Sequence, residues 1–63
     1  MLTEADIERA AQVVIDNKGG NAARAAEHRI HRLSHEGQAE AVAIWRRIER
    51  AISILLADGR GRP

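Results

Sequence analysis

Three histidines in the middle of the chain are the side chains best suited to bind a metal ion. His28, His31 and His35 are spaced by three and four residues, so on a helix they point within about 60° of one another. His31 and His35, one turn apart, have the spacing at which two histidines of one helix chelate Zn²⁺ or Ni²⁺. The residues between them lack the glutamate that would act as a general base, and neighbouring Arg29 and Arg32 repel a cation. We therefore interpret this cluster as a solvated polar face and expect no metal ion or other cofactor.

Three arginines nearer the C-terminus form a second charged cluster. Arg46, Arg47 and Arg50 lie on the side of their helix away from its apolar stripe, and Glu49 is the one acid at a favourable spacing. Solvent alone can satisfy them, but a counter-charge can also come from another helix, a partner subunit or nucleic-acid phosphate. Phosphate is the less favoured source, because the net charge is only +1 and there is no Phe or Tyr for base stacking. Weak nucleic-acid binding through these arginines and an Arg-Gly tail at residues 59–63 is the alternative function.

Residues for covalent or phosphate chemistry are missing from the sequence. The chain has no cysteine nucleophile, no glycine-rich phosphate loop in a strand context, and few hydroxyl side chains, namely Thr3, Ser34 and Ser53. A chain of 63 residues also leaves little room for a deep pocket. We therefore expect a protein that is not an enzyme and that binds no small-molecule substrate.

The first element that positions these residues is a helix expected over about residues 4–18. Thr3 is a favourable N-cap, and Asp6 three residues later completes the pattern of a capping box. Apolar residues then recur at three- and four-residue spacing until Gly19 and Gly20, which can adopt the left-handed conformation that ends helices.

Two further helices are expected, over about residues 22–36 and 38–57. Asn21 is a natural N-cap for the second helix, and Gly37 separates it from the third. Because the connections are short, successive helices should be antiparallel neighbours. The sequence therefore predicts an all-α, up-down-up three-helix bundle in a single domain, residues 1–58, followed by the flexible tail.

The third helix has the strongest apolar periodicity, with Trp45 near its middle, and we predict Trp45 to be the central packing anchor. The predicted core combines apolar residues at helical spacing from all three helices: Ile7, Val14, Ala26, Ile30, Leu33, Trp45, Ile48, Ile52 and Leu55. Twelve of the apolar residues in the chain are alanines, so this core barely offsets the conformational entropy lost on folding. Dimerisation is the expected way to complete it.

Apolar residues outside the core stripes indicate where a partner would bind. Val13 and Ile54 both lie off the core face of their helices. Residues 1–17 carry four acids against one arginine and residues 18–35 carry four bases against one glutamate, so these halves can pair within or between chains. We expect a protein–protein interaction or self-association module that forms a homodimer or binds a protein partner. Its candidate contact residues are Arg46, Arg47, Arg50 and Ile54.

The sequence indicates neither a membrane nor a secretory destination. Its longest apolar run, Ile54 to Ala57, is too short to cross a bilayer, and the N-terminus lacks a cationic stretch followed by an apolar one. The absence of cysteine fits a reducing compartment. We expect a cytoplasmic protein without membrane partners.

A series of small and apolar residues spans about residues 10 to 56. It reads Ala11-x-x-Val14-Ile15, Gly19-x-x-Ala22, Ala26-x-x-x-Ile30-x-x-Leu33-x-x-x-Gly37, then Trp45-x-x-Ile48-x-x-Ala51-Ile52-x-x-Leu55. This series resembles a domain-of-unknown-function family of short bacterial helical proteins with a C-terminal Trp helix. The resemblance implies a helix-glycine-helix-glycine-helix layout in a cytoplasmic protein without an assigned activity, and it carries over no catalytic residue.

Overall fold

The computed structural model describes residues 2–58 and is built from three α-helices. The elements in chain order are α1 (Glu4–Lys18), the 3₁₀ turn η1 (Gly19–Asn21), α2 (Ala22–His35) and α3 (Ala39–Ala57). Within residues 2–58 there is no strand, which confirms the all-α, three-helix class. Each helix begins and ends within one residue of its expected bounds. The tail expected at residues 59–63 lies outside the described residues.

Helix α1 begins with the capping box that the sequence predicts. The Thr3 hydroxyl accepts a hydrogen bond from the backbone N–H of Asp6 at 3.2 Å, and the Asp6 carboxylate accepts one from the N–H of Thr3 at 3.0 Å. Two of the N–H groups that a helix leaves unpaired at its start therefore have partners. Glu4 and Asp6 also place negative charge in the first turn, where it is stabilised by the helix dipole.

Glycines end the first two helices, and Asn21 precedes the second one without a side-chain cap. Gly19 and Gly37 adopt positive φ angles of 59° and 75°, a region that other residues enter at a cost. Asn21 is the N-cap residue of α2, as predicted, but its side chain makes no capping hydrogen bond. An N-cap side chain reaches the next turn from an extended backbone, whereas η1 holds Asn21 at φ −92° and ψ 9°.

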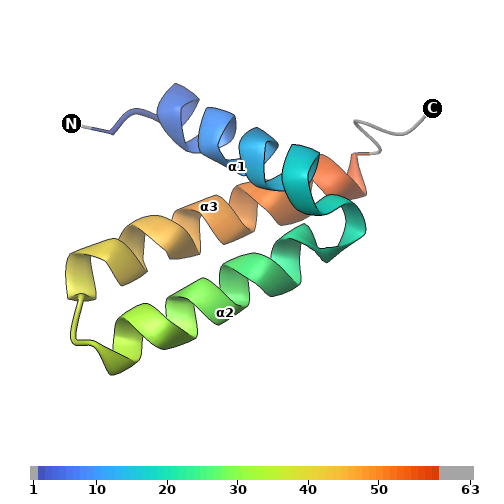
Figure 1. Cartoon of the computed structure of the whole chain (residues 1–63). Helices are drawn as coiled ribbons and strands as arrows, with labels where there is room; N and C mark the ends of the chain where they lie inside the picture. Colours follow the sequence, from blue (N-terminus) through green and yellow to red (C-terminus); the bar gives the residue numbers. More distant parts are fainter. Residues whose placement is uncertain (1, 59–63) are drawn as a thin grey trace.

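Helices α2 and α3 form an antiparallel pair, and α1 lies across it (Figure 1). The chain turns back at Gly37, so that α3 runs alongside α2 in the opposite direction, as the short connection predicts. Helix α1 runs obliquely over α3 and contacts it more extensively than it contacts α2. As a result α3 is the element on which both other helices pack.

The core is a thin layer of isoleucines and alanines. Ile7 and Ile52 are the largest side chains that are fully buried, and Ile48 lies beside them. Small residues let α1 and α2 approach α3 closely. The remaining buried residues of the described chain are Ala11, Ile15, Ala22, Ala26 and Ile30.

Trp45 lies at the margin of the core and not at its centre. Of the residues predicted to form the core, Ile7, Ala26, Ile30, Ile48 and Ile52 are buried, whereas Val14, Leu33, Trp45 and Leu55 are half-buried. Because α1 crosses α3 obliquely, it covers the middle of the apolar stripe of α3 and leaves the rest of that stripe partly open. The prediction that the indole anchors the centre of the core is therefore wrong.

No helix within residues 2–58 is both long and apolar enough to cross a lipid bilayer.

Candidate functional site

A crevice between α1 and α3 collects the arginine cluster together with two acids. We call it the α1–α3 crevice, and its lining residues are Glu4, Glu8, Arg46, Arg47, Arg50, Ala51, Ile54 and Leu55. Arg47 Nη2 donates a hydrogen bond to Glu4 Oε1 at 3.0 Å, and both side chains are at least half exposed. Helix α1 is thus the source of the counter-charge for Arg47. An exposed pair of this kind is worth at most about 1 kcal/mol, so it orients the side chains more than it stabilises the fold.

The acids in this crevice weaken the case for nucleic-acid binding. Phosphate affinity depends on uncompensated positive charge, and Glu4 and Glu8 place negative charge among the three arginines. Arg46 and Arg50 make no ion pair within residues 2–58. Nucleic-acid binding through these arginines and the tail at residues 59–63 stays a prediction, and the two acids reduce the positive charge that such binding needs.

Ile54 gives the α1–α3 crevice an apolar centre that faces solvent. Its side chain is 60% exposed, the largest exposed fraction among the large hydrophobic residues of the described chain. It lies in the same crevice as Glu8 and Arg50. Protein–protein interfaces combine apolar area with a polar rim, and Ile54 with its charged neighbours has both.

A second crevice lies between α1 and α2, with Trp45 of α3 at its base. We call it the α1–α2 crevice, and its lining residues are Val13, Val14, Asn17, Lys18, Ala25, His28, Arg29, Arg32 and Trp45. Among residues 2–58, no carboxylate lines this crevice. The guanidinium carbon of Arg29 lies 5.2 Å from the centroid of the Trp45 ring, within the range of a cation–π contact. Positive charge therefore surrounds an apolar base.

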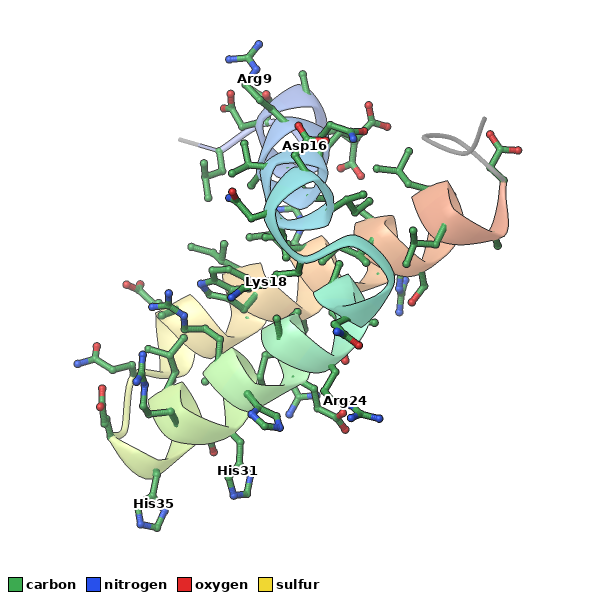
Figure 2. The ribbon with its side chains drawn as sticks, turned by 45° about the vertical axis from the view of Figure 1, so that its right-hand side comes forward. Arg9, Asp16, Lys18, Arg24, His31 and His35 are labelled. Atoms are coloured by element: carbon green, nitrogen blue, oxygen red, sulfur yellow. The ribbon has the colours of Figure 1, made fainter. Side chains whose placement is uncertain are left out.

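The three histidines line one open hollow on α2, together with Glu27 and Arg32. Figure 2 shows His31 and His35 projecting from α2 on the side away from α1, and all three histidines are exposed. His28 also lines the α1–α2 crevice. In the part of the chain that the structure describes, no three His, Cys, Asp or Glu side chains are placed to hold a metal ion.

The α1–α2 crevice is the surface that sequence reasoning missed. Its signals were present separately: an excess of positive charge in residues 18–35, and Val13 outside the stripe of its helix. What joins them to Trp45 is the oblique crossing of α1, which no local pattern encodes.

No protein-family model matches the chain, and neither a curated protein nor a solved structure matches it. The resemblance to a domain-of-unknown-function family therefore stays a prediction, and the two crevices are the features that indicate function.

Proposed function

We propose that this protein is a non-enzymatic self-association module that forms a two-fold symmetric homodimer through the α1–α3 crevice. The observation that carries the proposal is the exposed Ile54 in a crevice lined by both acids and arginines. We also propose that the protein is cytoplasmic, as expected from its sequence.

Two-fold symmetry requires a surface that is complementary to itself, because the same patch contributes from both copies. The α1–α3 crevice meets this condition, since its acids come from α1 and its arginines from α3. When a second copy is rotated by a half-turn onto it, Glu8 of each chain can face Arg50 of the other. The two Ile54 side chains then meet near the symmetry axis.

The small core supports the same proposal. Within residues 2–58, only Ile7 and Ile52 among the large side chains are fully buried, and a domain of this size has little stability to spare. Burying the exposed part of Ile54 in a dimer would contribute about 1 kcal/mol per chain. Dimerisation would therefore add buried apolar area to a fold whose own core is small.

The first test replaces Ile54, the exposed isoleucine of the α1–α3 crevice. We expect Ile54→Gln to shift the protein to the monomer in sedimentation equilibrium at micromolar concentration, because glutamine removes the apolar contact but remains compatible with a helix. Val13→Gln is the matched control, because Val13 is also exposed, at 53%, but lies in the other crevice. A wild-type protein that sediments as a monomer across this range would refute the proposed dimer.

The second test uses two variants, each with one reversed charge, whose charges are complementary to one another. We expect E8R and R50E chains each to self-associate weakly, because each homodimer places like charges opposite one another. An equimolar mixture should form a heterodimer, in which opposite charges face each other at both contacts. The heterodimer is detected by native mass spectrometry. A mixture that remains monomeric, alongside a dimeric wild type, would contradict the proposed pairing of Glu8 with Arg50.

A further inference from the structure

We propose that the α1–α2 crevice docks an acidic, amphipathic helical segment of another protein. This surface is distinct from the α1–α3 crevice, because the two have no lining residue in common.

The cations of the α1–α2 crevice belong to both of the helices that form its walls. Lys18 lies on α1, and Arg29 and Arg32 lie on α2. None of these three side chains makes an ion pair with another residue of the described chain. An acidic partner would therefore meet cations on both sides without first displacing a carboxylate.

The base of the crevice is suited to apolar side chains. Val13 is 53% exposed, and Trp45 is half-buried beside Val14 and Ala25. An amphipathic helix presents apolar side chains every three or four residues on one face and charged ones on its flanks. Such a helix places leucine-like side chains against the base while its carboxylates reach the cations of the walls.

A second copy of this chain fits this crevice less well. A two-fold contact would place like charges opposite each other, because the walls carry cations and no carboxylate. The acidic start of α1 is already engaged, since Asp6 accepts the capping hydrogen bond and Glu4 pairs with Arg47. The charge pattern therefore favours a different chain.

Single-stranded nucleic acid is also less favoured. A base would have to stack on Trp45, but the Arg29 guanidinium lies over that ring. Val13 and Val14 would then face sugars and phosphates without an apolar partner. A protein segment satisfies both the cations and the aliphatic side chains.

The test uses Trp45 as an internal reporter, because it is the sole tryptophan of the chain. The probe is a synthetic helical peptide with leucines on one face and glutamates on the other. We expect a saturable change in tryptophan emission that weakens as salt is raised. A peptide with glutamine in place of each glutamate should bind at least about tenfold more weakly, and this comparison leaves the protein unchanged.

Variants of the protein then locate the binding site. Arg32→Glu should weaken binding of the acidic peptide about tenfold or more. Arg24→Glu is the matched control, because it changes the net charge equally on the same helix but lies outside the crevice, on the side of α2 away from α1 (Figure 2). Lys18→Glu repeats the test from the α1 wall, and circular dichroism confirms that each variant is folded.

Three results would overturn the proposal. The first is that tryptophan emission shows no saturable change when the acidic peptide is added. The second is that Arg32→Glu and Arg24→Glu weaken peptide binding equally. The third is that an oligodeoxynucleotide binds at the crevice more tightly than the peptide does. The I54Q chain should bind the peptide as the wild type does. Failure of the dimer and failure of this docking site are therefore separate outcomes.

Discussion

At the scale of single residues, Thr3 and Asp6 show how local chemistry sets a helix boundary. The backbone N–H of Thr3, which donates a hydrogen bond to the Asp6 carboxylate, is the main cause of the lowered pKa of Asp6, and the Thr3 side chain and Arg9 act in the same direction. Because the folded state favours the charged form of Asp6, this group stabilises the fold above the ordinary aspartate pKa. The stabilisation by charged Asp6 is lost as the pH falls through the lowered pKa of this group in the folded state.

This sign leads to a prediction about acid stability. Asp6→Asn should lower the melting temperature at pH 7, and the gap between variant and wild type should narrow as the pH falls below about 3.9, the ordinary pKa of aspartate. The measurement is thermal denaturation by circular dichroism from pH 7 to about pH 2.5, well below that pKa. Because the two proteins differ at residue 6 alone, contributions that they share cancel in the difference. A constant gap over this range would show that the charge of Asp6 does not act through the cap.

At the level of the helices, each of the two connections contains a glycine with a positive φ angle. Gly37 has a φ of 75°, and a Cβ added there would have open space around it. Any cost of a side chain at this position is therefore backbone strain and not a clash. Gly20 also has open space, but it does not have a positive φ.

Replacement by alanine should destabilise the fold at Gly37 but not at Gly20. Gly37→Ala should lower the free energy of unfolding by about 1 kcal/mol, because alanine disfavours the left-handed region. Gly20→Ala should leave it unchanged or raise it by roughly 0.5 kcal/mol, because alanine restricts the unfolded chain without straining the folded one. Urea denaturation measures both changes. Equal effects at the two positions would contradict the conformational assignment of Gly37.

At the scale of the whole molecule, the division of α3 between buried and exposed residues follows from the crossing of α1. Ile52 is fully buried and Ile54, two residues later, is 60% exposed. One isoleucine contributes to folding and the other is free to contribute to association. Two residues only two positions apart on one helix therefore differ completely in burial, and the exposed one is available for the proposed association.

This division can be measured with the smallest apolar change. Ile52→Val should cost about 1 kcal/mol in the free energy of unfolding, because it removes a buried methylene group. Ile54→Val should cost less than about 0.5 kcal/mol at a protein concentration at which the chain is monomeric. Urea denaturation of both variants at that concentration checks the difference. Similar costs at the two positions would mean that Ile54 is packed in the monomer.

The three helices follow from the amino-acid sequence alone, because helix signals are local. The Thr3 cap, the glycine breaks and the three- and four-residue periodicity were sufficient to predict three helices and their bounds within one residue. The exposure of Ile54 also agreed with its position off the stripe. These features depend on residues within one or two turns of one another.

The part of each apolar stripe that is covered depends on how the helices pack in three dimensions. Periodicity places Trp45 and Ile52 on one face of α3, but the oblique crossing of α1 buries Ile52 and leaves Trp45 at the base of a cationic crevice. The same crossing brings Glu4 to Arg47, 43 residues later in the chain. The angle between two helices depends on how their side chains interdigitate, and contacts so distant in sequence leave no periodic signal in either helix.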